Sequence, residues 1–281
     1  MKNKYKEKNL KQLYYLPITI WLTIFFMIPT LIIVYFSILK KGVYGGIKSY
    51  TSFSLDAYRE LLTPELMYIT YKTLEMSIII TFIVVIISIP TAYYISRSKH
   101  KNLWLLLIVI PFWTNFLVRI FAVVGLIGNN GIINRFFMTV FNLQNPIPML
   151  YNKFAVILIS VYIFMPYAIL PLYSAIEKFD FSLIDAARDL GATKNKALLK
   201  VFVPGIKGGI ITAIILTFIP AIGSYAVPDI VGGTDGIMLG NIIANKMFVL
   251  RDWPSAAAIS TVFIIITIFT LIIGGKNADK Q

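Results

Sequence analysis

Cysteine is absent from this chain of 281 residues, and histidine occurs once, at His100. Without thiols, the chain cannot form a disulfide scaffold, a thiolate zinc site or a cysteine nucleophile. Charged residues are also scarce, at 14% of the chain, against roughly 25% in an average soluble domain. Because a soluble enzyme of this length needs a polar surface that so few charges cannot supply, the composition indicates an integral membrane protein.

Long apolar runs are abundant: apolar residues make up 58% of the chain and the mean hydropathy is +0.78. A bilayer core about 30 Å thick is spanned by about 20 helical residues. The length of the runs favours helices over strands, and six runs qualify, at 16–39, 73–96, 103–127, 154–176, 206–228 and 254–275. We therefore predict an all-α integral membrane protein with one transmembrane domain, residues 16–275. Residues 1–15 and 276–281 are its tails.

The net charge of +13 is interpreted as a topology signal rather than as nucleic-acid binding. Six spans place both termini on one side of the membrane, together with the loop at 177–205. The segments on that side carry twice as many Lys and Arg residues as the segments on the other side. The positive-inside rule then predicts a multi-pass protein with both termini in the cytoplasm. The apolar run that follows the basic amino tail is too long for a cleaved signal peptide, so we expect a retained helix.

The segment between the fourth and fifth spans is polar and strongly patterned. Ser182 is expected to cap a helix with Asp185 in its first turn, and Gly191 to end that helix in a left-handed conformation. Thr193 is expected to cap a second helix that Pro204 ends. One face of the first helix is predicted to be apolar, through Ile184, Ala187 and Leu190. Such a pair of helices could dock on another protein or lie on lipid headgroups as an interfacial hairpin.

The spacing Asp185-Ala186-Ala187, three residues, then Gly191-Ala192 resembles the EAA loop of binding-protein-dependent ABC importer permeases. The family pattern usually begins with Glu, and Asp185 keeps its charge. The resemblance implies six transmembrane helices in the type I ABC importer permease (MetI-like) fold, and a coupling helix that docks in a cleft of the ATPase subunit. It implies that the coupling residues are Asp185, Ala186, Ala187, Arg188, Gly191 and Ala192.

Longer strings resemble the spermidine/putrescine (PotB-type) branch of these permeases: 111–115 (PFWTN), 170–178 (LPLYSAIEK), Gly232-Gly233, Gly240-Asn241 and 251–254 (RDWP). The resemblance implies a bacterial cell-membrane importer with two ATPase subunits, a second, homologous permease subunit and an extracytoplasmic polyamine-binding protein. This chain has no GxxxxGK[ST] phosphate loop, so we expect ATP and Mg²⁺ to bind the ATPase partners and no cofactor to bind here. The chain itself is then a transport subunit and not an enzyme.

A polyamine is recognised by spaced carboxylates and by aromatic faces that make cation–π contacts. The candidates for the substrate pathway are Trp113, Glu75, Tyr225 and Asp229. Each has a simpler structural explanation. Glu75 could pair with Lys72, Trp113 could pack against a neighbouring helix, and Asp229 could be a solvated loop residue.

Three other functions compete with a polyamine importer. The chain could be the permease of an ABC importer for another small solute. A secondary transporter would run without an ATPase and usually shows inverted repeats, of which none is evident. A membrane-embedded enzyme would need a cluster of catalytic or metal-binding residues, and a single loop histidine does not provide one.

Overall fold

The computed structural model describes residues 15–278, and all regular elements in this range are helices, apart from two isolated β-bridges. The predicted amino tail lies outside the described residues except for Tyr15. The chain divides into two compact units. The smaller unit contains residues up to 66 together with 243–264, and the larger unit contains residues 67–242 and those from 265 onward.

Five helical stretches within residues 15–278 are long and apolar enough to cross a bilayer: Tyr15–Ser37, Pro64–Arg97, Phe116–Phe141, Lys153–Glu177 and Trp253–Ile272. A sixth span is present if Lys194–Gly205 and Lys207–Ile222, which meet at a bend of 67°, are counted as one. The prediction of an all-α membrane protein is confirmed.

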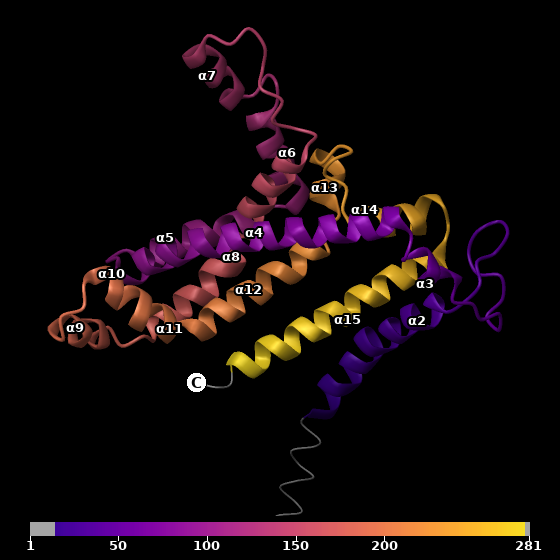
Figure 1. Ribbon diagram of the computed structural model, residues 1–281, viewed down its shortest axis with the longest axis horizontal. Coiled ribbons are helices and arrows are strands. Elements are labelled where there is room, and N and C mark those ends of the chain that lie inside the picture. The colour runs from indigo at the N-terminus through magenta and orange to yellow at the C-terminus, as the bar shows by residue number, and fades with distance from the viewer. Residues whose placement is uncertain (1–14, 279–281) are drawn as a thin grey trace, which may run out of the picture. The chain divides into compact units, whose positions relative to one another are not determined.

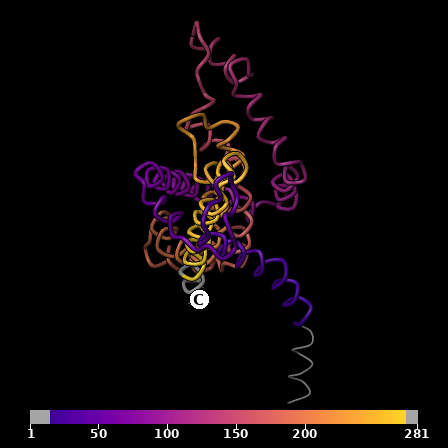
Figure 2. The backbone as a smooth tube through the Cα atoms, turned by 90° about the vertical axis from the view of Figure 1, so that its right-hand side faces the viewer, coloured from indigo at the N-terminus to yellow at the C-terminus, as the bar shows by residue number. Residues whose placement is uncertain are grey.

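The larger unit contains most or all of α4 (Pro64–Arg97), α5 (Lys101–Val109), η2 (Ile110–Trp113), α6 (Phe116–Ile127), α7 (Ile132–Phe141), α8 (Lys153–Glu177), α9 (Ser182–Asp189), α10 (Lys194–Ala197), η3 (Leu198–Phe202), α11 (Val203–Gly205), α12 (Lys207–Ile222), α13 (Ala226–Val231) and α14 (Leu239–Ala244). Helices α8 and α12 run side by side (Figure 1). The short helices α9, α10 and α11 lie at one end of this pair, and α13 lies at the other. In both views α7 projects away from the pair (Figures 1 and 2).

The stretch predicted as a third span, 103–127, is not one continuous helix. Pro111 has no N–H to donate, and the chain tightens into the 3₁₀ turn η2 at this point. Thr114 is then extended, and a new helix, α6, begins after Asn115. The Asn115 side chain caps α6 by accepting a hydrogen bond of 2.8 Å from the N–H of Leu117. The break places Trp113 at the end of a helical segment rather than in the middle of one.

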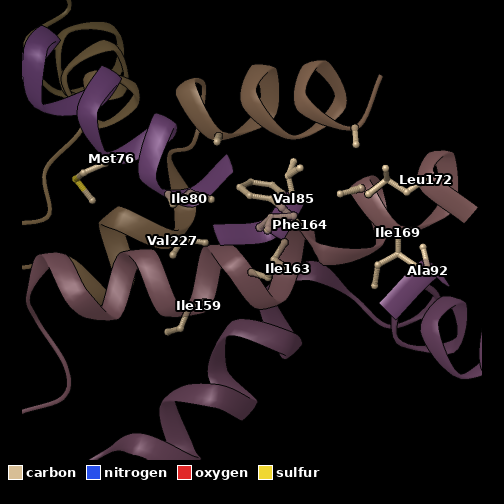
Figure 3. Packing of buried hydrophobic residues seen from close by; sticks show 14 of the residues in the cluster. Met76, Ile80, Val85, Ala92, Ile159, Ile163, Phe164, Ile169, Leu172 and Val227 are labelled. Atoms are coloured by element: carbon tan, nitrogen blue, oxygen red, sulfur yellow. The ribbon is translucent and has the colours of Figure 1, made fainter. Parts of the chain in front are cut away.

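The core of the larger unit is apolar and is built from α4, α8, α12 and α13. Met76, Ile80, Ile159, Ile163 and Val227 are each at most 2% exposed, and Figure 3 shows several of these side chains meeting between the helices. Gly209 lets α12 approach α8 closely, because a Cβ at this position would overlap the Cβ of Ala175. Close packing of this kind holds helices together in lipid, where apolar burial alone gives little driving force.

The smaller unit contains η1 (Thr23–Met27), α2 (Ile28–Ser37), α3 (Asp56–Glu60), η4 (Asn245–Val249) and the first part of α15 (Trp253–Ala278). Buried ion pairs join its separate segments. Lys246, which is 7% exposed, donates to Glu60 Oε1 at 2.6 Å, and Ser255 donates to Glu60 Oε2 at 2.7 Å. Lys41 and Asp252 form a second pair at 2.9 Å. Burial disfavours the charge of Asp252, but hydrogen bonds from Lys41 and Ser255 outweigh burial and lower its pKa.

We expect Glu60→Ala to destabilise the protein by about 1–3 kcal/mol, because it leaves the buried Lys246 ammonium without a partner. The estimate is reduced from the value for a fully buried pair, since the Glu60 side chain is 40% exposed. Thermal unfolding of the purified protein in detergent would measure the effect. Arg59→Ala is the matched control, because its pair with Asp56 is exposed and should contribute less than about 0.5 kcal/mol. Equal midpoints for the two variants would contradict the expectation.

Candidate coupling and translocation sites

The segment from Lys178 to Gly205 folds into α9, α10, η3 and α11, and we refer to it as the coupling segment. Its first helix does not begin as predicted. Ser182 is the first helical residue rather than the cap, and its N–H donates to Asp180 Oδ1 at 2.9 Å. Hydrogen bonds from the side chain and backbone of Ser182 also lower the pKa of Asp180. The Asp180 carboxylate therefore satisfies the first N–H of α9, and the Ser182 hydroxyl does not cap the helix.

The hinge between the two helices has the predicted conformation. Gly191 has a φ of +88°, and the N–H of Ala192 donates to the carbonyl of Ala187 at 3.0 Å. This is the left-handed glycine ending of an α-helix. Thr193 then caps α10 by accepting a hydrogen bond from the N–H of Lys196. A Cβ on Gly191 would meet nothing within 4 Å. Glycine is therefore favoured here by the positive φ of the backbone and not by a lack of room for a side chain.

The exposed face of the coupling segment combines polar and apolar groups. The side chains of Asp185, Arg188 and Lys194 help to line a polar hollow of about 440 Å³. Leu183, Leu190 and Leu199 are 50%, 90% and 69% exposed. Leu190, predicted to lie on the apolar face of this helix, is instead its exposed C-cap, because α9 ends at Asp189. Exposed leucines around a charged hollow are typical of a surface that another protein covers.

Five side chains connect the coupling segment to the transmembrane helices, and we call them the aromatic joint: Tyr93, Arg97, Phe179, Phe181 and Phe202. The ring of Phe202 lies 5.4 Å from Tyr93 and 5.3 Å from Phe179, between ring centroids. The Arg97 guanidinium at the end of α4 lies 4.5 Å from the centroid of Phe181. These edge-to-face and stacked contacts join the start of α9 and the end of η3 directly to the end of α4. Sequence reasoning missed this joint, although three phenylalanines in a polar loop were a visible signal.

A second contact, directly before the coupling segment, joins α5 to α8. Glu177 Oε1 accepts hydrogen bonds from Lys101 at 2.6 Å and from Tyr173 at 2.9 Å. Lys101 begins α5, which continues through η2 to Trp113. This ion pair therefore connects the start of the coupling segment to the helix that leads to a candidate pathway residue.

Trp113 lies at the end of η2 and is 81% exposed, so it does not pack closely against any helix within residues 15–278. Glu75 pairs with Lys153 of α8 at 2.6 Å rather than with Lys72, which lies over the ring of Tyr68. The pairing joins α4 to α8. No local pattern indicates this pairing, because the two residues lie 78 positions apart.

Tyr225 and Asp229 are connected through Asn241. The Asn241 side chain donates to the Tyr225 carbonyl at 3.3 Å and to Asp229 Oδ1 at 3.4 Å. Both Tyr225 and Asp229 are exposed. Within residues 15–278, no ion pair or side-chain hydrogen bond joins this group to Trp113 or Glu75, and no cluster of three or more His, Cys, Asp or Glu residues could hold a metal ion.

Near the helix break, the Arg119 guanidinium stacks over two rings, at 4.9 Å from Phe112 and 5.7 Å from Phe116. Its Nε is buried and has no hydrogen-bond partner in the part of the chain that the structure describes. The cation is held by aromatic faces next to Trp113, so this region already uses the cation–π chemistry that a polyamine pathway would need.

Comparison with known proteins identifies relatives over nearly the whole chain. The spermidine/putrescine transport system permease protein PotB of Escherichia coli is 35% identical over 248 residues, covering 88% of this chain and 90% of the relative. PotB of Haemophilus influenzae is 37% identical over 267 residues, covering 93% and 92%. The Escherichia coli inner membrane ABC transporter permease protein YdcU is 27% identical over 257 residues, covering 83% and 82%.

The fold matches that of a solved bacterial ABC transporter involved in the import of alginate, with a TM-score of 0.74 and 98% of each chain covered. At 16% identity this likeness shows the fold alone. The sequence family described as the binding-protein-dependent transport system inner membrane component matches residues 8–275. The chain therefore belongs to the family of binding-protein-dependent ABC importer permeases, which are multi-pass membrane transport subunits and not enzymes.

Proposed function

We propose that this chain is the membrane-spanning permease subunit of an ATP-driven importer of spermidine and putrescine. The observation that carries the proposal is the identity of 34–37% to PotB permeases from several bacteria over most of both chains. The more distant solved relatives supply the fold and not the substrate. The uptake experiment below distinguishes this proposal from the import of another small solute.

In this proposal, two ATPase subunits, a second, homologous permease and an extracytoplasmic polyamine-binding protein complete the importer. One ATPase subunit docks on the coupling segment, through Asp185, Ala186, Ala187, Arg188, Gly191 and Ala192. The exposed leucines and the polar hollow of this segment support such a contact. ATP and Mg²⁺ are bound by the ATPase subunits.

Movement of the docked ATPase reaches the transmembrane helices through two contacts of the larger unit. The aromatic joint passes it to α4, and the Lys101–Glu177 pair passes it to α5. Packed rings transmit such a displacement because protein interiors are close to incompressible. Helix α5 leads through η2 to Trp113, so a change at the ATPase also moves a pathway residue.

The substrate pathway in this proposal uses Trp113, Glu75, Tyr225 and Asp229. Trp113 offers an exposed ring face for a cation–π contact. Asp229 offers a carboxylate that Asn241 holds in place. Glu75 already neutralises Lys153, so an incoming ammonium group would compete with Lys153 for the same carboxylate. A site of this kind attracts a polycation and can still release it.

Uptake of labelled solutes tests the proposed substrate. Cells of the source organism that lack this chain should lose high-affinity uptake of spermidine and putrescine, and a plasmid copy should restore it. Excess unlabelled spermidine should compete with the label, whereas amino acids and sugars should not. Unchanged polyamine uptake in the deletion, together with loss of uptake of another solute, would contradict the polyamine assignment and leave the family assignment intact.

The proposed topology has both termini and the coupling segment in the cytoplasm. Because the chain has no cysteine, single-cysteine variants at the exposed positions Gln144 and Asn195 can test it. A membrane-impermeant thiol reagent added to intact cells should label Gln144→Cys and not Asn195→Cys. Position 144 is preferred to the neighbouring Asn142, whose φ of +49° would strain a cysteine. Labelling of Asn195→Cys alone would reverse the proposed orientation.

A further inference from the structure

Two segments of the smaller unit, far apart in sequence, line an open cavity of about 430 Å³. One is the glycine turn that follows α2, and the other runs from η4 to the first residue of α15. We call this cavity the Arg251 pocket, and it is lined by Tyr44, Gly45, Gly46, Met247, Phe248, Arg251 and Trp253. None of these residues belongs to the coupling segment or to the candidate pathway.

The backbone of the Arg251 pocket is held in a costly conformation. Arg251 has a φ of +50°, a left-handed value that is unfavourable for a side chain of this size. The Gly46 N–H donates to the Arg251 carbonyl at 2.6 Å, and Gly45 lies so close that an added Cβ would be 2.8 Å from Arg251 Cβ. Gly45 and Gly46 reach this approach with φ values of +94° and +69°. Local strain that the surroundings enforce in this way is common at binding sites.

The charge of Arg251 is left available, whereas two other cations of the smaller unit are neutralised. Lys41 pairs with Asp252, and Lys246 pairs with Glu60. Arg251 makes no ion pair with any residue in the range 15–278, and its side chain is exposed. A guanidinium presents a planar fork of donors that matches a carboxylate in geometry and charge.

The rim around Arg251 is aromatic and apolar. Tyr44 is 98% exposed and Phe248 is 78% exposed, with Val43 and Val249 beside them at 87% and 70%. An arginine surrounded by exposed aromatic side chains has the composition of a protein-binding hot spot. The same composition argues against the polyamine as occupant, since Arg251 repels a cation. It also argues against burial in hydrocarbon, where the loop backbone would lack hydrogen-bond partners.

We propose that the Arg251 pocket is a docking site for the extracytoplasmic binding protein, and that it receives a carboxylate side chain flanked by apolar residues. This inference rests on the proposed function, which supplies the binding protein as a partner. In the proposed topology, the loop after α2 and the segment before α15 both face the side on which that protein approaches. Charge complementarity to Arg251 selects an acidic contact on the partner.

The affinity of the complex for its binding protein tests the proposal. The complete importer is placed in nanodiscs, and purified spermidine-loaded binding protein is titrated onto it. Arg251→Gln should weaken binding by about 10- to 100-fold, the range of a charged hot-spot residue, and should make binding less sensitive to salt. Arg251→Lys should recover part of the loss. Lys48→Gln is the matched control, because it removes a nearby exposed cation outside the pocket and should change affinity less than about 3-fold.

Tyr44→Ala provides a second variant that removes no buried packing, because Tyr44 is 98% exposed. It should weaken binding by about 5- to 30-fold. If both Arg251→Gln and Tyr44→Ala bind the binding protein with unchanged affinity, the docking site is overturned. The proposed function still stands in that case, provided that the importer takes up polyamines. A second outcome would also overturn the docking site. If Arg251→Gln leaves the affinity for the binding protein unchanged but alters how the activity of the importer depends on the anionic lipid content of the nanodisc, the pocket binds lipid headgroups. A parental complex that binds no binding protein would contradict the proposed function itself.

Discussion

Replacing Gly191 with valine is expected to lower polyamine uptake and ATPase association together, by about 5-fold or more. Gly191 has a φ of +88°, and a β-branched residue in this region is disfavoured by roughly 1–2 kcal/mol or more. Since about 1.4 kcal/mol corresponds to a factor of ten, the hinge between α9 and α10 should lose its native conformation in most molecules. The membrane helices should still insert, because no span contains this residue.

Gly191→Asn is the matched control for this prediction. Asparagine tolerates the left-handed conformation far better than valine, and the space around Gly191 is open. We therefore expect uptake within about 2- to 3-fold of the parental value. Copurification of the ATPase from detergent extracts and uptake in cells would be measured for both variants. Full uptake by Gly191→Val would remove the coupling role of this segment.

Replacing Trp113 with leucine is expected to lower polyamine uptake by about 2- to 30-fold without affecting assembly. The range follows from a cation–π contact of roughly 0.5–2 kcal/mol, taking about 1.4 kcal/mol as tenfold. Leucine keeps an apolar side chain, and the Trp113 ring is largely exposed in the part of the chain that the structure describes. Uptake should be measured at saturating substrate with the binding protein present, so that capture does not limit the rate.

Trp21→Leu is the control for a general effect of losing an exposed indole. Trp21 is 60% exposed on the first apolar helix, away from any candidate pathway residue in sequence. It should leave uptake within about 2-fold of the parental rate. If Trp113→Leu behaves like this control, Trp113 is not part of the pathway, although the importer assignment would stand.

Local signals made the coupling segment predictable. A left-handed conformation at Gly191 and capping by Thr193 depend only on neighbouring residues, and the structure has both. The same reasoning failed for Ser182 because α9 begins at this residue and Asp180, two residues earlier, accepts the hydrogen bond from its N–H. It failed for Leu190 because the helix ends one residue earlier than its apolar spacing suggested.

Features that depend on distant residues could not be read from the sequence. Hydropathy predicted a third span over 103–127, but an average over a window does not show that this stretch divides into separate helical segments at η2 and the extended Thr114. The partner of Glu75 is Lys153 on another helix, whereas sequence spacing suggested Lys72. The aromatic joint likewise brings Tyr93 against Phe202, and only the packing of α4 on the coupling segment makes them neighbours.

Transport by the purified importer tests the central claim most directly. The complete complex would be reconstituted in proteoliposomes, with ATP supplied on the side of the coupling segment and spermidine-loaded binding protein on the other. The account predicts accumulation of labelled spermidine that requires ATP hydrolysis and the binding protein and that Gly191→Val abolishes. Spermidine accumulation driven by an ion gradient without ATP, or ATP-driven transport of another solute with no transport of spermidine or putrescine, would contradict it.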